Sequence, residues 1–321
     1  MSTGADTAGA AGGSPPSRLQ ASGPRYGEKV IQALLAFCGI LSVLTTTAIV
    51  FSLIGPTIGF FEVVPIGEFL FGTDWTPQFE PPSFGVLAIV VGTLNVTLWA
   101  MLFAIPVGLG GAIYLSEYAT PRVRKTIKPI LEILAGIPTV AIGFFAATFI
   151  LPDIIQRFWP GEFLGGAEKP FMALAAGLGV GLMIVPIIAS ISEDAMSAVP
   201  SGLREGAYAM GATKMEVATR VVLPAALSGI VASIVLAISR AVGETMIVVL
   251  AAGSNPNLTF NPVESIQAMT AYIATTATGD ISTGSLDYQA VFAVGTVLFV
   301  MTLIMNLISI SLVRRFREVY E

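Results

Sequence analysis

Two ionisable residues, Arg240 and Glu244, lie inside a long apolar stretch of the sequence, in the segment SRAVGETM. Inserting a charged side chain into the centre of a bilayer costs about 3 kcal/mol of free energy. Such residues therefore face a protein interior or a water-filled path. The guanidinium group carries a permanent charge and a fork of donors that suits a tetrahedral oxyanion. The two residues are four apart, so we expect them to share a helix face and to pair. A charge on a substrate path and a structural ion pair are both consistent with this pattern.

Three more polar residues are candidates for the same path. Ser233 falls on the face of Arg240 in the predicted helix, and Asn95 and Thr97 lie in an earlier apolar stretch. Hydrogen bonds between neighbouring helices explain such residues equally well. The candidate path residues are therefore Arg240, Glu244, Ser233, Asn95 and Thr97.

The composition indicates an integral membrane protein. Of the 321 residues, 54% are hydrophobic and only 12% are charged, whereas soluble domains carry about 25% charged residues. There is no His and a single Cys, Cys38, so the commonest metal ligand and acid–base group is missing. We expect no catalytic residue, no metal, no cofactor and no nucleic-acid partner. The sequence also lacks a G-x-x-x-x-G-K-[ST] loop for ATP, so any ATP hydrolysis belongs to a partner subunit.

Six apolar spans must position these residues, because each is long enough to cross a bilayer as a helix. They are expected at about 30–54, 84–115, 129–151, 171–191, 225–252 and 289–313. The third is interrupted by AGIPT, where Gly136 marks a hinge or a close helix contact. The pattern predicts an all-α integral membrane fold with six transmembrane helices over residues 28–317. Residues 1–27 are rich in Gly, Ala, Ser and Pro and predict a disordered tail, and residues 318–321 form a short C-terminal end.

Positive charge predicts the orientation of the spans. Of the 16 Lys and Arg residues, thirteen fall on the side shared by both termini, two fall on the other side, and Arg240 lies within a span. Both termini are therefore expected in the cytoplasm. On the opposite side, the segment FLFGTDW is expected to form a short amphipathic turn on the membrane surface.

The predicted cytoplasmic loop 192–224 has the pattern of a helix, a glycine elbow and a second helix. Ser201 is a candidate N-cap of the first helix. Gly211 supplies the left-handed residue that ends it. Thr213 and Glu216 match a capping box, which starts the second helix at once.

Helical spacing gives each of these short helices one apolar face. The first face consists of Leu203, Ala207 and Met210, and the second of Met215, Ala218 and Val222. Pro224 marks the join to the fifth span. A short exposed helix of this kind can insert into a groove of a partner protein.

Glu205-Gly206-Ala207, Gly211 and Leu223-Pro224 match the spacing of the cytoplasmic EAA loop of ABC importer permeases, with Gly206 in place of the middle Ala. The resemblance implies the type I importer permease fold, in which the first helix of the loop docks on an ATPase subunit. It assigns this coupling role to Glu205, Gly206, Ala207, Met210, Gly211, Leu223 and Pro224. An ordinary amphipathic loop on the membrane surface is the alternative.

Four segments resemble the PstC family of phosphate importer permeases. They are RAVGETM at 240–246, LAGIPTVAIGFF at 134–145, FLFGTDWTP at 69–77 and GTLNVTL at 92–98. The resemblance covers about residues 28–317 and implies a multi-pass subunit of a bacterial or archaeal cytoplasmic (inner) membrane that carries inorganic phosphate. It also implies partners: a PstA-like second permease subunit, a pair of PstB-like ATPase subunits, a PstS-like phosphate-binding protein and membrane lipid.

Three alternatives remain open at this point. The cargo could be another oxyanion, such as sulfate or molybdate, because the EAA loop addresses the ATPase and not the substrate. An intramembrane enzyme would need a nucleophile or a metal set that the sequence does not provide. A secondary transporter would be expected to show two matching broken-helix repeats, which are not evident here.

Overall fold

A computed structural model describes residues 26–158 and 169–316. The chain divides into two units, residues 1–51 and 52–321. Helix α1 (Tyr26–Val63) begins in the first unit and ends in the second, and from Gly27 to Val63 it is long and apolar enough to cross a membrane. The predicted disordered tail lies almost wholly outside the described residues, and the C-terminal end at 318–321 lies wholly outside them.

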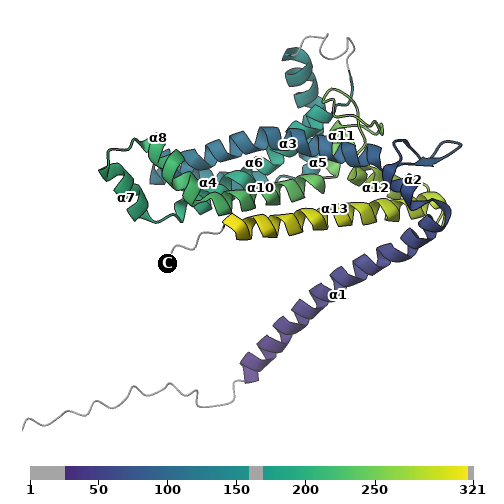
Figure 1. The fold of residues 1–321 in the computed structure, drawn as a ribbon, viewed down its shortest axis with the longest axis horizontal. Helices are drawn as coiled ribbons and strands as arrows, with labels where there is room; N and C mark the ends of the chain where they lie inside the picture. Colours follow the sequence, from purple (N-terminus) through teal and green to yellow (C-terminus); the bar gives the residue numbers. More distant parts are fainter. Residues whose placement is uncertain (1–25, 159–168, 317–321) are drawn as a thin grey trace, which may run out of the picture. The chain divides into compact units, whose positions relative to one another are not determined.

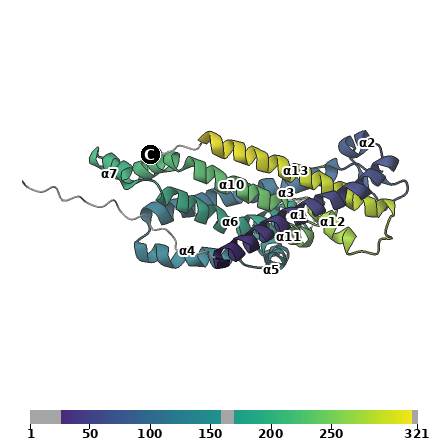
Figure 2. The same ribbon diagram turned by 90° about the horizontal axis from the view of Figure 1, so that it is seen from below.

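The described part of the second unit is helical apart from one two-stranded antiparallel ribbon. Its elements are α2 (Ile66–Phe71), β1 (Trp75–Thr76), β2 (Ser83–Phe84), α3 (Leu87–Ile113), η1 (Tyr114–Tyr118), α4 (Pro121–Ala135), α5 (Thr139–Phe145), η2 (Ala146–Gln156), α6 (Ala173–Ser197), α7 (Ser201–Ala209), α8 (Lys214–Glu216), η3 (Val217–Val222), α9 (Leu223–Ala225), α10 (Leu227–Val242), α11 (Met246–Ala251), α12 (Met269–Ala277) and α13 (Leu286–Phe316), the three η segments being π-helical. Both views place α7 at one end of this unit and α2 and α12 at the other (Figure 1, Figure 2).

The predicted all-helical membrane fold is confirmed. Among the described residues, five helices are long and apolar enough to cross a membrane. A sixth span is obtained when residues 214–225 and 227–242 are counted together, although the two parts meet at a bend of 72°. The chain is therefore a multi-pass membrane protein.

Helices α3 and α6 pack closely because glycines face the contact. A Cβ atom on Gly177 would lie 2.6 Å from Cβ of Trp99, and one on Gly181 would lie 3.1 Å from the carbonyl oxygen of Ala100. Small residues let helix backbones approach in this way, which matters in lipid because no hydrophobic force drives helices together. This contact holds the centre of the second unit.

The third predicted span differs from the structure at its start. Residues 129–135 belong to α4, which has no buried residue, and the apolar helix starts only at Thr139. Pro138 has no N–H to continue the helix, and it also restricts Ile137. A Cβ on Gly136 would meet only the carbonyl oxygen of Ile133, at 3.3 Å. Gly136 therefore marks a break between two helices and not a close contact with a third.

The fifth predicted span, 225–252, is not one continuous helix. Its central part, α10, has 16 residues, or about 24 Å of helix, which is shorter than the roughly 30 Å hydrocarbon core. The chain bends at Ala226 before α10, and Gly243 ends α10. A separate helix, α11, begins at Met246. This break changes the geometry of the Arg240 and Glu244 pair.

The segment FLFGTDW forms the end of α2 and the turn that leads into β1, and it has an exposed side with Leu70 and Phe71 and a buried side. Phe69 and Trp75 are buried in a cluster with Phe60 and Phe84. Ring centroids lie 5.3 Å apart for Phe60 and Phe69, and 4.9 Å apart for Trp75 and Tyr272 of α12. Edge-to-face aromatic packing of this kind stabilises beyond simple burial. The two buried side chains of the segment therefore belong to a small aromatic core at the end of the unit opposite α7, and the place of its exposed side on the membrane surface stays a prediction.

Candidate functional site

The predicted coupling loop begins with α7, which starts one residue earlier than the sequence indicates. Pro200, in an extended conformation, is the N-cap, and Ser201 is the first helical residue. The prediction of Ser201 as the N-cap is therefore wrong. The fixed φ of proline is compatible with this position, and no side chain caps the helix.

The glycine elbow and the capping box are both confirmed. Gly211 has a φ of +85°, and no atom would come within 4 Å of a Cβ atom added to it. Its role is therefore conformational and not a matter of space. The backbone N–H of Thr213 donates to Glu216 Oε2 at 2.9 Å, and the N–H of Glu216 donates to Thr213 Oγ1 at 3.4 Å. The hydrogen bond from the Thr213 backbone lowers the pKa of Glu216.

The structure separates a buried face of α7 from an exposed one. Ala207 is buried, whereas Glu205 and Gly206 are exposed. Met210 is 86% exposed and Leu203 is 40% exposed. Ala207 thus anchors the helix, while Leu203 and Met210 present apolar side chains on an end of the chain that no other described residue covers.

The second half of the loop runs through α8, η3 and α9. Ala218 and Val222 are buried as expected, but Met215 is 60% exposed, so its predicted place on their face is wrong. The π-helical turn of η3 rotates the later residues relative to Met215. Leu223 is half-buried and Pro224 is exposed, and the chain bends two residues after Pro224.

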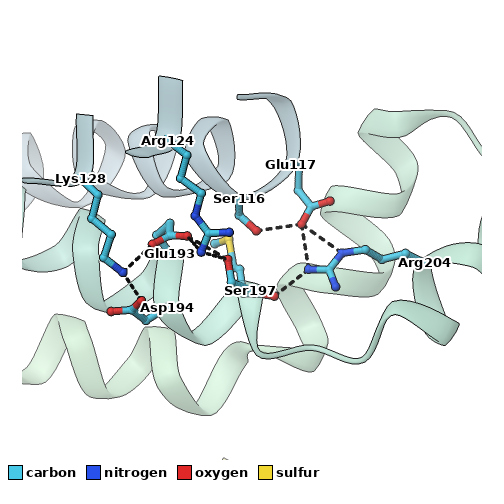
Figure 3. Close-up of polar contacts among 9 residues, drawn as sticks. Ser116, Glu117, Arg124, Lys128, Glu193, Asp194, Ser197 and Arg204 are labelled. Carbon is cyan, nitrogen blue, oxygen red and sulfur yellow. Dashed lines mark hydrogen bonds and ion pairs between the residues drawn. The ribbon is translucent and has the colours of Figure 1, made fainter. Parts of the chain in front are cut away.

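Arg204 ties α7 to the rest of the unit (Figure 3). Its Nη2 and Nε atoms donate to Glu117 Oε1 in η1 at 3.1 and 3.3 Å. Its Nη2 and Nη1 atoms also donate to the carbonyl oxygens of Met196 and Val199 at 2.7 and 2.6 Å. The Glu117 carboxylate is 4% exposed, and Ser116 donates a further hydrogen bond to it at 2.9 Å. Three donor atoms therefore converge on one oxygen of this buried carboxylate, as expected for a buried charge.

A second ion cluster joins α4 to the end of α6 (Figure 3). The Glu193 carboxylate is 1% exposed and contacts Arg124, and it accepts from Lys128 at 3.1 Å and from Ser197 at 2.8 Å. Arg124 also donates to Ser197 at 2.7 Å. Lys128 contacts Asp194 as well, and this hydrogen bond raises the pKa of the Lys128 ammonium.

Sequence reasoning missed both clusters, because it used Arg124, Lys128 and Arg204 only as orientation charges. One signal was available for α4: Arg124 and Lys128 are four apart and share a helix face. No comparable signal joins Arg204 to Glu117, since the two are 87 positions apart. The first cluster ties the candidate coupling helix α7 to η1 and to the end of α6, and the second ties α4 to the same end of α6.

The predicted pair between Arg240 and Glu244 is not formed. Glu244 lies beyond the end of α10 and is 8% exposed, and its Oε1 accepts from the backbone N–H groups of Met246 and Ile247 at 3.1 and 3.3 Å. Glu244 therefore caps α11. Thr270 adds a hydrogen bond to the Glu244 carbonyl oxygen at 2.7 Å. The helix break at Gly243 removes the four-residue spacing that pairing needed.

Arg240 has the opposite environment. Its side chain is exposed, and it forms no hydrogen bond or ion pair with any residue that the structure describes. Leu236, 52% exposed, lies one turn before it on α10, and the exposed Gly243 lies three residues after it. Within the described part of the second unit, this face of α10 is open.

The other candidate path residues are buried and each makes at least one hydrogen bond, although Oδ1 of Asn95 has no partner among the described residues. The hydroxyls of Ser233 and Ser192 lie 2.8 Å apart between α10 and α6. Asn95 Nδ2 donates to the carbonyl oxygen of Thr259 at 2.9 Å, and Thr97 donates to Thr93 within its own helix at 2.8 Å. The structure therefore does not gather these residues around Arg240. Their place on a substrate path stays a prediction.

Comparisons with known proteins agree with this architecture. Residues 104–318 match the family described as binding-protein-dependent transport system inner membrane component. The probable ABC transporter permease protein YqgH of Bacillus subtilis is 35% identical over 77% of each chain. The phosphate transport system permease protein PstC of Pasteurella multocida is 31% identical over 94% of this chain and 97% of its own.

A solved bacterial alginate ABC transporter contains a chain with the same fold, at a TM-score of 0.62 and 18% identity over 91% of this chain and 98% of that one. The family match covers two thirds of the sequence and includes α7, α10 and α13. The chain belongs to the binding-protein-dependent transport system inner membrane component family, with the all-helical membrane fold of an ABC importer permease.

Proposed function

We propose that this chain is a permease subunit of an ATP-driven importer for inorganic phosphate and forms half of the translocation path. The similarity to the PstC protein of Pasteurella multocida, which extends over almost the whole chain, supports phosphate as the cargo. In this proposal the chain hydrolyses no ATP, and a separate cytoplasmic subunit supplies the energy.

The observation that carries the proposal is the environment of Arg240. A guanidinium in a membrane-spanning helix cannot face lipid without a large cost. Arg240 has no partner within the described chain and points away from its core. It must therefore face another subunit or a water-filled path. A permanent cation with a fork of donors at such a place suits an oxyanion such as phosphate.

The open face of α10 also indicates a second membrane subunit. Leu236 and Gly243 flank Arg240 on that face. A PstA-like permease subunit packed there would enclose Arg240 between the two chains and exclude lipid from it. Phosphate released by an external PstS-like binding protein would then cross near Arg240.

Coupling to ATP is assigned to the exposed face of α7. The apolar side chains of Leu203 and Met210 suit insertion into a groove of a PstB-like ATPase subunit. Gly211 sets the direction in which α7 leaves the elbow. Movement of the ATPase pair would reach the spans through α7 and through the ion pair of Arg204 with Glu117. The loop and both termini lie in the cytoplasm in this arrangement.

Uptake of labelled phosphate by cells that lack this chain, with and without its return, tests the proposal. High-affinity phosphate uptake should disappear and return with the chain. Sulfate and molybdate uptake, measured in the same cells, should not change. Normal phosphate uptake without the chain would refute the phosphate assignment, and loss of sulfate or molybdate uptake instead would reassign the cargo.

A further inference from the structure

A pocket of about 580 Å³ lies between η1 and α4, outside the coupling face and the candidate path. Its lining contains three cationic side chains, Arg124, Lys125 and Lys128, and one acidic residue, Glu132. The rest of the lining is largely apolar and small: Leu115, Ser116, Ala119, Pro121 and Pro129. The pocket thus places three cationic side chains and one carboxylate beside small and apolar residues.

The three cations are not equally available. Arg124 and Lys128 are held by Glu193 and Asp194, and their side chains are 39% and 27% exposed. Lys125 is exposed and forms no ion pair within the part of the chain that the structure describes. Its ammonium is therefore the one cation of this lining that no carboxylate of the described residues pairs with, although Glu132 lines the same pocket.

The same helix presents exposed apolar side chains in its second half, beyond the residues that line the pocket. No residue of α4 is buried, and Ile130, Ile133 and Leu134 are 48%, 72% and 42% exposed. Helix α4 joins the span that contains α3 to the span that contains α5, so it must lie at a membrane surface. An exposed helix with basic residues in its first half and apolar residues in its second suits the boundary between headgroups and acyl chains.

We propose that this pocket binds the phosphodiester headgroup of an anionic phospholipid, with Lys125 as the main contact and Ile130 and Ile133 along the acyl chains. Basic pockets beside membrane spans attract such headgroups. Free phosphate would match the cations, but it would leave the exposed apolar face of α4 without a partner. The proposal goes beyond the phosphate path and does not depend on which substrate is transported.

Native mass spectrometry of the assembled transporter in detergent tests this site. The complex is titrated with phosphatidylglycerol and, separately, with phosphatidylcholine of the same acyl chains. Wild-type complex should retain phosphatidylglycerol in preference to phosphatidylcholine. Lys125→Gln should weaken phosphatidylglycerol binding about fivefold, as expected for one Lys at an anionic surface. Lys29→Gln removes the same charge on the same predicted side, so it controls for diffuse attraction and should change little.

A second variant separates lipid from free phosphate. Ile133→Gln keeps every cation but removes an apolar contact, so it should weaken phosphatidylglycerol binding. In a separate competition experiment, excess inorganic phosphate should not displace the lipid from the wild-type complex. Displacement by phosphate together with wild-type behaviour of Ile133→Gln would assign the pocket to the free anion. Equal losses in Lys29→Gln and Lys125→Gln, or no loss in Lys125→Gln, would overturn the proposed site.

Discussion

Arg204 of the coupling helix α7 donates hydrogen bonds to Glu117 of η1 at 3.1 and 3.3 Å, although 87 positions separate the two residues. The same guanidinium holds the carbonyl oxygens of Met196 and Val199 after the end of the fourth predicted span. One side chain therefore connects the surface expected to receive the ATPase with two membrane spans. Such a connection can transmit movement, because the carboxylate is too deeply buried to exchange its partner for water.

Removing this connection should uncouple ATP hydrolysis from transport. Arg204→Gln leaves the buried Glu117 carboxylate without its cation. We expect the amount of phosphate transported per ATP hydrolysed to fall by roughly 2- to 30-fold, the range of measured coupling changes of about 0.5–2 kcal/mol. Parallel assays of uptake and ATPase activity in proteoliposomes measure this ratio. Arg220→Gln is the matched control, because Arg220 lies on the same loop, is 79% exposed and sits 3.9 Å from its acidic partner. An unchanged ratio in Arg204→Gln would rule out a transmitting role.

Gly211 should be sensitive to any side chain, whereas Gly206 should accept a methyl group. A β-branched residue is strained at a φ of +85°, so Gly211→Val should shift α7 and lower both ATPase association and uptake while the chain still inserts. Gly206→Ala is the control: no atom lies within 4 Å of its added Cβ, and its φ is not positive. Co-purification of the ATPase subunit reads out the effect. Wild-type association of Gly211→Val would show that the elbow does not position the coupling helix.

Arg240 and Glu244 should respond differently to loss of charge. Arg240→Gln removes the unpaired cation, so phosphate uptake should collapse while assembly with the other subunits survives. Glu244→Gln keeps an oxygen that can accept from Met246 and Ile247, so it should be tolerated far better than Glu244→Ala. Uptake and subunit association, measured on each variant, separate the two roles. Full uptake by Arg240→Gln would remove Arg240 from the substrate path.

The contact between α3 and α6 should not accept even a methyl group at Gly177. The added Cβ would lie 2.6 Å from Cβ of Trp99, so the helices must move apart. We expect Gly177→Ala to destabilise the chain by about 1–3 kcal/mol, as overpacking does in well-packed interiors. Gly110→Ala is the control, because nothing lies within 4 Å of its added Cβ. Thermal unfolding in detergent compares the two, and equal melting temperatures would contradict the packing argument.

Labelling from outside the cell should reveal the orientation of the spans. In a Cys38→Ser background, an impermeant thiol reagent should modify a cysteine placed at Asn257 and spare one placed at Lys214. The expectation follows from the thirteen-to-two distribution of Lys and Arg. Modification at position 214 and not at position 257 would show that the spans have the opposite orientation.

The sequence by itself determined the features that depend on local chemistry. Long apolar runs predicted an all-helical membrane fold. A segment that crosses lipid must pair all its backbone N–H and C=O groups, and a helix does so within itself. Gly211 and the capping box of Thr213 with Glu216 were predictable, since a positive φ and a cap each depend on a few neighbouring residues. The coupling loop also depends on a short stretch of sequence, so the spacing of its residues predicted the ABC importer permease family.

Tertiary structure decided which charged groups meet. Spacing alone predicted that Arg240 would pair with Glu244, but the helix ends at Gly243 and Glu244 caps α11 instead. The pairing of Arg204 with Glu117 depends on how η1, α6 and α7 pack together, which no short-range pattern encodes. Removing a charged group from water costs free energy, and only several hydrogen-bond donors around the group offset that cost. These donors come from distant parts of the sequence, so the partners of a buried charge depend on the whole fold. The glycine elbow and the capping box of the coupling loop therefore follow from the sequence, whereas the ion clusters that hold α7 and α4 follow only from the packing.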